Sequence, residues 1–480
     1  MQGNNVLFIM ADEHNYNCIN AVGNNSIITP NINNLIKGGT LFSNAYTPSP
    51  LCVPARASLA TGTYVHKNKY WDGAHAYDGK VMGWQHILRE NNINVTSVGK
   101  LHYKDRTVDT GFTESIEPMH LKDGLGDLFG LLREDMPPKD ACKRLSEELG
   151  RGECEYLEYD RLITKKATEW IQNQDSGSDN SSEPWVLFVS FVSPHYPLVS
   201  PPYYYDLYND INLPYDNYPS QPPGKLHSWV RGIRESWPYD DYMDNEKRKI
   251  AVQAYYGMCS FMDSNVGQIV NELKQSNFYD NTTIIYASDH GESLGNRGLW
   301  GKMTMYEDSS SIPLIISGKD FKENSICETP VSLLDIYPTI LDITSLDKSE
   351  ASPDIDGKSL IKIGNSKYDK ERCILSEYHG AGAYGGAFML RMGDYKYIYY
   401  VGHERELFDV REDPNEEVNL CDQVKYNELV DKLDKELNSI IDPKYVDSMA
   451  RQSQSKMLDE VGGKDFVLKR GNYAGTPVGS

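Results

Sequence analysis

A short stretch of the chain, residues 51–62, places Cys52, Pro54 and Arg56 two residues apart and ends in Gly62. Pro54 suits the first turn of a helix, the residues after it are good helix formers, and Gly62 suits the helix end. We therefore expect Cys52 at a helix N-terminus, where free backbone N–H groups and the helix dipole favour an anion. Because Arg56 lies one turn further on, it can reach back to the same point. A thiol in such a position beside a guanidinium indicates a site for a tetrahedral oxyanion.

Acidic and imidazole side chains follow two apolar runs of the chain. Residues 6–11 form a nearly continuous apolar run that ends at Asp12, and the β-branched run 282–287 leads to Asp289 and His290. Apolar runs of this length are typical of strands covered on both faces, and the carboxyl ends of such strands carry the ligand sites of open α/β sheets. Two carboxylates and one imidazole suit a hard or borderline divalent cation.

Two further predicted strands deliver candidate cations. Residues 94–98 are followed by Lys100 and His102, which alternation along an extended segment places on one side. Residues 185–192 give the strongest strand signal in the chain, and they run into a turn in which His195 stands between two prolines. These side chains can grip an oxyanion.

Helical patterns alternate with these strands, so the chain is predicted to be α/β. Residues 159–173, 246–273 and 427–441 have apolar residues at helical spacing. Residues 387–391, 396–401 and 406–409 are predicted to form short strands of a smaller, second sheet.

Composition limits the possible partners and locations. The chain of 480 residues has a net charge of −21, which argues against a nucleic-acid partner. No apolar run approaches the ~20 residues that span a bilayer, so no membrane association is expected. The N-terminus shows no basic region with a cleavage site, and the eight cysteines contain no C-x-x-C pair. We predict a cytoplasmic protein with reduced thiols.

The stretch Cys52-x-Pro54-x-Arg56, followed by Ser-Leu-Ala-Thr-Gly at 58–62, resembles the signature of type I sulfatases of the alkaline phosphatase superfamily. Gly-Lys-x-His at 99–102 and the block at 299–307 resemble further family motifs, and the resemblance extends over about residues 5–420. In that family a maturation enzyme oxidises the cysteine to formylglycine, and one hydroxyl of its hydrated aldehyde attacks sulfur. The resemblance therefore implies that a formylglycine-generating enzyme is a partner of this chain.

The resemblance implies an alkaline-phosphatase/sulfatase-like α/β fold, with a large mixed sheet flanked by helices and a smaller C-terminal α+β subdomain with an antiparallel sheet. We expect a catalytic domain over residues 1–370, since 349–370 is polar and turn-rich, a subdomain over 371–441 and a tail over 442–480.

The resemblance also implies roles for individual residues. The expected metal ligands are Asp12, Cys52 as formylglycine, Asp289 and His290; calcium is the first choice, with magnesium and manganese open. The expected catalytic residues are Cys52, Arg56, Lys100, His102, His195 and Lys302. Lys100 and His102 are expected beside the formylglycine, Lys302 on the sulfate, and either His195 or Lys302 as the acid that protonates the leaving alcohol. Many sulfatases have a second early aspartate where this chain has Glu13, so whether Glu13 is a metal ligand stays open.

Three functions are compatible with these motifs. The first is hydrolysis of a small-molecule sulfate ester, near the choline sulfatase branch. The second is a phosphonate monoester or phosphodiester hydrolase with the same nucleophile, and the third is an anion-binding protein in which Cys52 is never converted. The sequence does not name the alcohol, and the candidates for its pocket are Trp71, Asp72, His75, Tyr103, Glu377, Tyr378 and His379.

The tail begins at Asp442-Pro443, and six polar residues at 451–456 interrupt its apolar stripe. We expect such a segment to bury too little apolar surface to order itself. It is then either a frayed C-terminus or a segment that lies across a neighbouring subunit. We predict the second, so that the protein is a homodimer or homotetramer.

Overall fold

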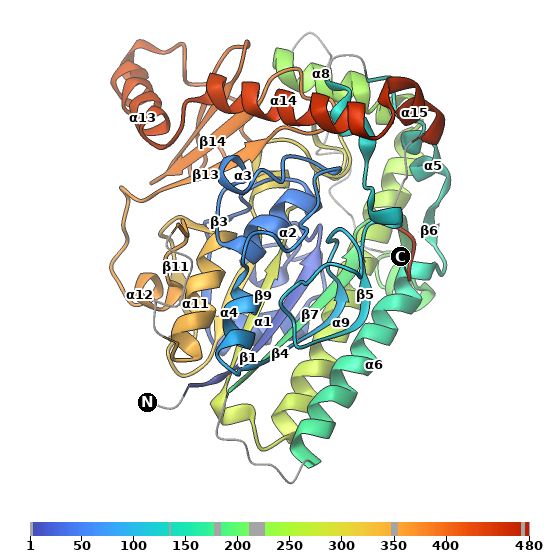
Figure 1. Cartoon of the computed structure of the whole chain (residues 1–480), viewed down its shortest axis with the longest axis vertical. Helices are drawn as coiled ribbons and strands as arrows, with labels where there is room; N and C mark the ends of the chain where they lie inside the picture. The colour runs from blue at the N-terminus through green and yellow to red at the C-terminus, as the bar shows by residue number, and fades with distance from the viewer. Residues whose placement is uncertain are drawn as a thin grey trace.

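A computed structural model describes residues 3–133, 136–176, 184–210, 226–346, 354–471 and 476–479 of the chain. Its centre is an eight-stranded sheet (Figure 1). In spatial order the strands are β11 (Ser325–Cys327), β2 (Thr40–Phe42), β10 (Leu314–Ser317), β9 (Thr282–Ser288), β1 (Asn5–Asp12), β7 (Trp185–Pro194), β4 (Asn94–Lys100) and β5 (Glu114–Met119).

The strands that carry the predicted site are neighbours and run in the same direction. β1 pairs in parallel with β9 on one side and with β7 on the other, and β4 pairs in parallel with β7 and β5. Among the described strands of this sheet, β10 alone runs in the opposite direction, because it is antiparallel to both β9 and β2. The carboxyl ends of β9, β1, β7 and β4 therefore meet at one edge of a mixed sheet.

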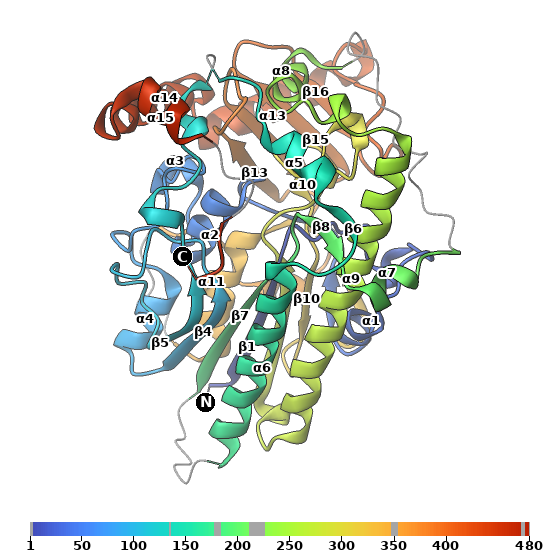
Figure 2. The same cartoon turned by 90° about the vertical axis from the view of Figure 1, so that its right-hand side faces the viewer.

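Successive side chains of β1 point to opposite faces of the sheet and pack in two separate hydrophobic cores. One set, Val6, Phe8 and Met10, packs in the core that contains α2 (Cys52–Thr61), α4 (Trp84–Glu90) and α11 (Ile336–Ile343). The other set, Leu7, Ile9 and Ala11, packs in the core that contains α1 (Pro30–Lys37), α6 (Glu155–Ser176) and α9 (Asn245–Gln275). Figure 2 shows α6 and α9 side by side over this second face.

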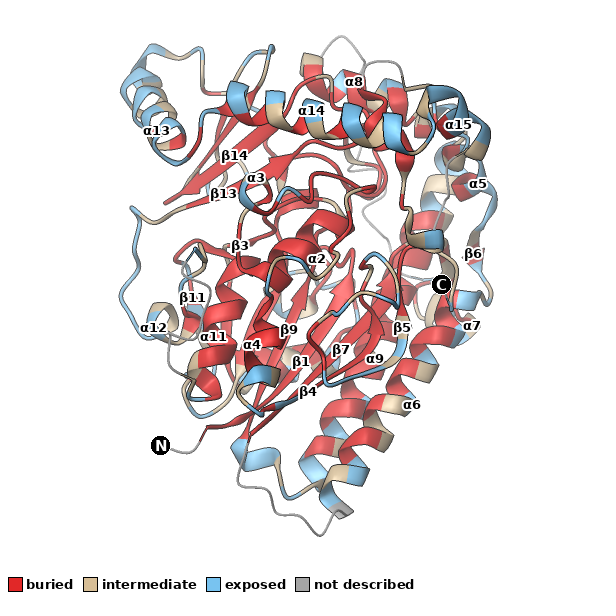
Figure 3. Cartoon of the chain, in the orientation of Figure 1, coloured by how far each residue is buried: buried red, intermediate tan, exposed pale blue. Residues whose placement is uncertain are grey.

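The apolar runs behave as predicted, since every residue of β1, β7 and β9 is buried. Figure 3 shows this buried sheet between helices whose outer faces are exposed. Among the described residues, no helix combines the length and the apolar character needed to cross a membrane. The predicted strands and the helices at 159–173 and 246–273 are confirmed, and with them the α/β class.

A second, antiparallel sheet lies C-terminal to the first, which confirms the predicted smaller subdomain sheet. Its strands are β13 (Cys373–Tyr378), β14 (Ala387–Met392), β15 (Tyr395–Tyr400) and β16 (Glu406–Asp409), of which β13 was not predicted. One face of this sheet packs against α13 (Asn427–Ile440) and α14 (Pro443–Glu460). The domain limits at 370 and 441 stay predictions, and residues 349–353 of the predicted boundary lie outside the described residues.

Short elements complete the described chain. Two small parallel pairs join β3 (Ala45–Tyr46) to β12 (Val331–Ser332) and β6 (Leu149–Arg151) to β8 (Leu198–Ser200). Short helices are α3 (Val65–Asn68), α5 (Ala141–Glu147), α7 (Pro202–Asp206), α8 (Ser228–Ser236), α10 (Glu307–Ser310) and α12 (Leu360–Gly364).

The expectation that the tail does not order itself is wrong for residues 443–470. They form α14 and α15 (Gly463–Arg470), which pack on the same chain. The physical reason lies in the six polar residues at 451–456 that interrupt the apolar stripe. Among them, Gln454 donates to the Asp72 carboxylate at 2.7 Å and to the His379 carbonyl at 2.7 Å, so hydrogen bonds replace apolar contacts there. Residues 472–475 and 480 lie outside the described part, and the predicted contact with a second subunit stays a prediction.

Candidate active site

The predicted chemical groups converge at the carboxyl edge of the central sheet. Asp12 is the last residue of β1, and Asp289 directly follows β9, whose Ser288 pairs with Ala11 of β1. Lys100 is the last residue of β4. Parallel pairing therefore brings together residues that are up to 277 positions apart, counted from Asp12 to Asp289.

Cys52 is the first residue of α2, as predicted. The preceding residue, Leu51, has an extended backbone, and α2 ends at Gly62 with a φ of 68°. The Cys52 Sγ lies 3.1 Å from the Nε2 of His290 and 3.6 Å from the Oδ1 of Asp12. The buried helix N-terminus thus points the thiol at the two strand ends.

Four groups at this point can hold a cation. One ligand atom from each of Asp12, Cys52, Asp289 and His290 lies within 4.8 Å of the others, and all four residues are buried. The Nδ1–H of His290 donates to the Gly291 carbonyl at 3.0 Å, because a carbonyl can only accept. This tautomer leaves the Nε2 lone pair facing the cluster, as metal-ligating histidines require. The donor set therefore fits a divalent cation.

Arg56 orients both carboxylates. Its Nε donates to the Oδ2 of Asp289 at 2.7 Å and its Nη2 to the Oδ2 of Asp12 at 3.0 Å, while Nη1 donates to the Lys100 carbonyl and the Ser190 hydroxyl. The Oδ1 of each carboxylate stays directed at the cluster, 3.7 Å and 3.6 Å from the His290 Nε2. Arg56 is buried and is not among the residues that line the cavity.

Lysine charge keeps Asp12 ionised. The Nζ of Lys100 lies 2.6 Å from the Oδ2 of Asp12. Burial raises the pKa of Asp12, but the charges of Lys100 and Arg56 outweigh burial and hold that pKa well below its ordinary value. An ionised carboxylate is the form that a metal binds.

A hydrogen bond fixes the tautomer of His195, and another holds the ring of His102. The Nδ1–H of His195 donates to the Tyr196 carbonyl at 2.7 Å, so its Nε2 faces the site. The Nε2 of His102 lies 2.8 Å from the Thr476 hydroxyl, which the C-terminal tail supplies. Burial, together with Lys302 for His195 and Lys100 for His102, lowers the pKa of both rings well below the ordinary value, so both are neutral at neutral pH.

Lys302 completes the predicted set, and its partner is Glu13. The Nζ of Lys302 donates to the Oε2 of Glu13 at 2.9 Å. Burial disfavours the ammonium, but the carboxyl groups of Glu13 and Asp12 raise the pKa of Lys302 well above its ordinary value, so the lysine stays protonated.

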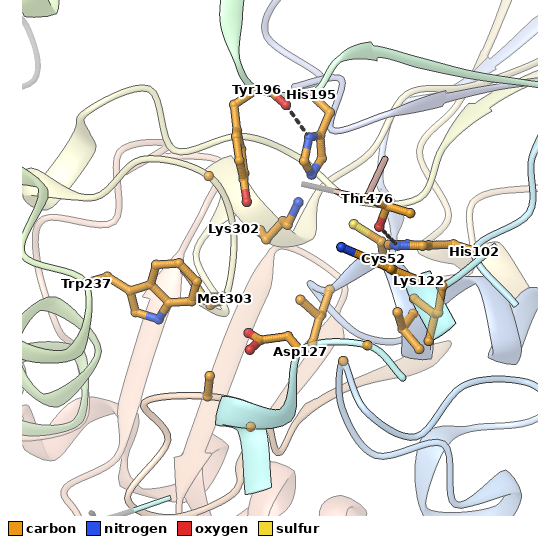
Figure 4. Close-up of a pocket in the computed structure, with 18 of the residues that line it drawn as sticks. Cys52, His102, Lys122, Asp127, His195, Tyr196, Trp237, Lys302, Met303 and Thr476 are labelled. Carbon is orange, nitrogen blue, oxygen red and sulfur yellow. Dashed lines mark hydrogen bonds between the residues drawn. The ribbon is translucent and has the colours of Figure 1, made fainter. Parts of the chain in front are cut away.

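These groups open onto one cavity of about 980 Å³ that includes open solvent. Figure 4 shows Cys52, His102, His195 and Lys302 on one side of it and Trp237 on the other. The cavity is mainly apolar and aromatic, with Tyr196, Trp237, Tyr239 and Tyr378 in its wall, and Asp127 adds a carboxylate to this wall.

The prediction of the alcohol pocket is wrong for six of seven residues. Among the described residues, only Tyr378 of that set lines the cavity. Asp72 instead pairs with His75 at 2.9 Å, and Glu377 pairs with His66 at 2.7 Å, in a buried polar region beneath α14. Asp127 and Trp237 also line the cavity and were not predicted. Trp237 lies 3.9 Å under the Lys139 ammonium, which also pairs with Asp127, and no local pattern indicates these long-range contacts.

Comparison with known proteins agrees with this geometry. A family model described as sulfatase matches residues 4–346, and a model described as N-sulphoglucosamine sulphohydrolase, C-terminal, matches residues 295–442. Choline-sulfatase of Rhizobium meliloti (strain 1021) is 30% identical over 427 residues, which are 87% of this chain and 82% of that protein. Arylsulfatase K of Canis lupus familiaris is 30% identical over 485 residues, which are 95% of this chain and 85% of that protein.

Solved structures share the fold. The phosphonate monoester hydrolase of Agrobacterium radiobacter superposes with a TM-score of 0.71 at 22% identity, over 91% of this chain and 95% of that one. A protein solved in complex with its substrate D-glucosamine-2-N,6-O-disulfate superposes with a TM-score of 0.70 at 20% identity, over 96% of this chain and all of the other (100%). The match over most of its length shows that this chain belongs to the sulfatase family and is a sulfuric ester hydrolase.

Proposed function

We propose that the protein hydrolyses a sulfate ester of a small alcohol with Cys52, converted to formylglycine, as the nucleophile. The observation that carries this proposal is the position of Cys52 at the N-terminus of α2, 3.1 Å from the His290 Nε2, in a cavity that Lys100 and Lys302 also line. An anion-binding helix end, two ammonium groups and a candidate metal site surround one reactive position.

The environment of Cys52 argues against direct use of its thiol. Burial, reinforced by the charge of Asp12, raises the pKa of Cys52 to about 12. Since the thiolate is the nucleophilic form of cysteine, this raised pKa disfavours the unconverted Cys52 thiol as the nucleophile. This supports the conversion that membership of the sulfatase family implies, and it disfavours an unmodified cysteine enzyme.

The metal that the family implies fits Asp12, Asp289 and His290, together with the oxygen that replaces the Cys52 sulfur. Two carboxylates in this set favour calcium, with magnesium and manganese as the other choices. When bound, the cation and the hydrated aldehyde supply Lewis-acid activation and an oxygen nucleophile. Arg56 holds both carboxylates in the orientation that directs one oxygen of each towards this position.

The remaining residues bind charge and move protons. Lys100 and Lys302 face the cavity and stabilise the sulfate group and the charge that develops during transfer. The neutral His195 has its only N–H on the Tyr196 carbonyl, whereas Lys302 carries protons at Nζ. We therefore assign Lys302 rather than His195 as the donor to the leaving alcohol. His102 lies beside the Cys52 position in the cavity wall, where its neutral ring can accept a proton from a hydroxyl.

A second candidate is hydrolysis of phosphonate monoesters or phosphodiesters at the same site. The adjacent Asp289 and His290, which both face the cluster, favour it as a specific alternative, and the fold is that of a phosphonate monoester hydrolase as well. Both substrate classes present a tetrahedral monoanion, which the same cations bind.

A substrate panel tests the proposal. Purified enzyme with a converted Cys52 and added calcium is assayed on an aryl sulfate, choline sulfate and a phenyl phosphonate monoester. The proposal predicts that a sulfate ester has the highest kcat/KM and that Cys52→Ala abolishes turnover. A higher kcat/KM on the phosphonate establishes the second candidate, and equal rates for the wild type and Cys52→Ala would contradict both.

A further inference from the structure

Glu13 directly follows the metal-site carboxylate Asp12, but its side chain leaves the cluster. Its backbone has a φ of 70°, in the left-handed region that residues other than glycine rarely adopt. Such a conformation persists only where the surroundings hold it, and it is concentrated at functional sites.

Two hydrogen bonds hold this conformation. The Glu13 N–H donates to the Oδ1 of Asp289 at 3.2 Å, and the Glu13 carbonyl accepts from the Tyr255 hydroxyl at 2.6 Å. The turn at the end of β1 is thus tied to the same aspartate that faces the candidate metal position. Because of this turn, the Asp12 side chain faces the candidate metal position and the Glu13 side chain faces Lys302.

The Glu13 carboxylate contacts the groups on the leaving-group side. Its Oε2 accepts from the Lys302 Nζ at 2.9 Å and lies 3.4 Å from the His195 Nε2, and the side chain is fully buried. A second glutamate fixes the backbone next to the same lysine. The Glu292 Oε1 accepts from the backbone N–H of Gly301 at 2.7 Å. Lys302 is therefore held at two points: Glu292 binds the backbone of the preceding Gly301, and Glu13 binds the Lys302 ammonium.

We propose that Glu13 is a positioning residue that holds the Lys302 ammonium at the leaving-group side of the cavity, and that it is not a metal ligand. This inference rests on the role of Lys302 in the proposed function. The competing arrangement is a cation between Asp12, Glu13 and His195, whose ligand atoms also lie within 4.8 Å of one another. The Lys302 ammonium argues against it, because it already occupies the Glu13 Oε2 and repels a second cation there.

Metal content is the first test, and it does not depend on activity. Wild type, Glu13→Ala and Asp12→Ala are dialysed against calcium, passed through a desalting column and analysed by inductively coupled plasma mass spectrometry. We expect Glu13→Ala to retain the wild-type metal content and Asp12→Ala to lose it. Loss of metal from Glu13→Ala would make Glu13 a ligand and overturn the proposal.

Steady-state kinetics is the second test. Because Glu13 acts through Lys302, Glu13→Ala is expected to lower kcat by about 10- to 100-fold, as small misplacements of catalytic groups do. KM should not rise, since the variant leaves the cations that bind the substrate anion, Lys100 and Lys302, in the cavity. Glu13→Gln keeps an oxygen acceptor for the ammonium and should recover most of the lost kcat. The exposed Glu371, which pairs with Lys432, gives the control variant Glu371→Ala with unchanged kinetics.

A double-variant cycle separates positioning from an independent role. Adding Glu13→Ala to Lys302→Ala should lower kcat no further, because residues that act as one unit are not additive. Losses that multiply would overturn the proposal. A wild type that cleaves only the phosphonate ester refutes the proposed sulfate-ester function; the same cycle is then run on that ester and still decides the role of Glu13.

Discussion

Replacing Arg56 by methionine removes the group that holds the two metal-site carboxylates. The guanidinium is 1% exposed and donates at 2.7 Å to Asp289 and at 3.0 Å to Asp12, both fully buried. Breaking a buried ion pair by removing one partner costs about 3–5 kcal/mol, because the remaining charge is left uncompensated. We expect Arg56→Met to lose free energy of unfolding in this range in a chelator, and less with saturating calcium, whose charge compensates the same carboxylates.

Denaturant unfolding followed by circular dichroism measures this difference with and without calcium. The control is Arg405→Met, because Arg405 pairs with Asp434 at 3.0 Å while 40% exposed, and an exposed pair is worth about 1 kcal/mol or less. A loss for Arg56→Met in chelator no larger than that of the control would refute the account of Arg56. A loss that is unaffected by calcium would refute the link between Arg56 and the metal.

Three further predictions concern the metal, the tail and pH. Asp289→Asn removes one ligand charge, so we expect most activity and bound metal to be lost, with partial rescue at high calcium; full activity in chelator would contradict the site. Truncation after Gly471 keeps α14 and α15 but removes the Thr476 hydroxyl that lies beside His102. We expect kcat to fall while the melting temperature stays unchanged. Light scattering on the full-length and the truncated protein tests the predicted oligomer. Burial raises the pKa of Glu406 to about 7, so the folded state holds an extra proton and stability should fall by up to about 3 kcal/mol as pH rises from 4.5 to 7. In Glu406→Gln that slope should be absent from pH-dependent unfolding curves.

Local sequence predicts this site well where chemistry sits at strand ends. Asp12, Lys100 and Asp289 each end or follow an apolar run, and parallel strands bring such positions to one edge without any long-range information. The helix that begins at Cys52 is predictable for a similar reason, since proline and glycine mark its limits.

The alcohol pocket was not predictable, because its wall is assembled from distant segments. Trp237 and Asp127 share the Lys139 ammonium, a contact that no pattern in any one segment indicates. The tail was mispredicted because Gln454 fills a gap in its apolar stripe with two buried hydrogen bonds. Buried polar networks of this kind stabilise a segment that apolar periodicity alone rejects.

The mass of the peptide that contains Cys52 tests the central claim most directly. The wild-type protein is expressed in a host that has a formylglycine-generating enzyme, digested, and analysed by mass spectrometry. We predict a peptide about 18 Da lighter than the unmodified sequence, because a carbonyl oxygen replaces the thiol sulfur and two hydrogen atoms are lost. A peptide that carries only the unmodified thiol, from protein that nevertheless hydrolyses sulfate esters, would contradict the account.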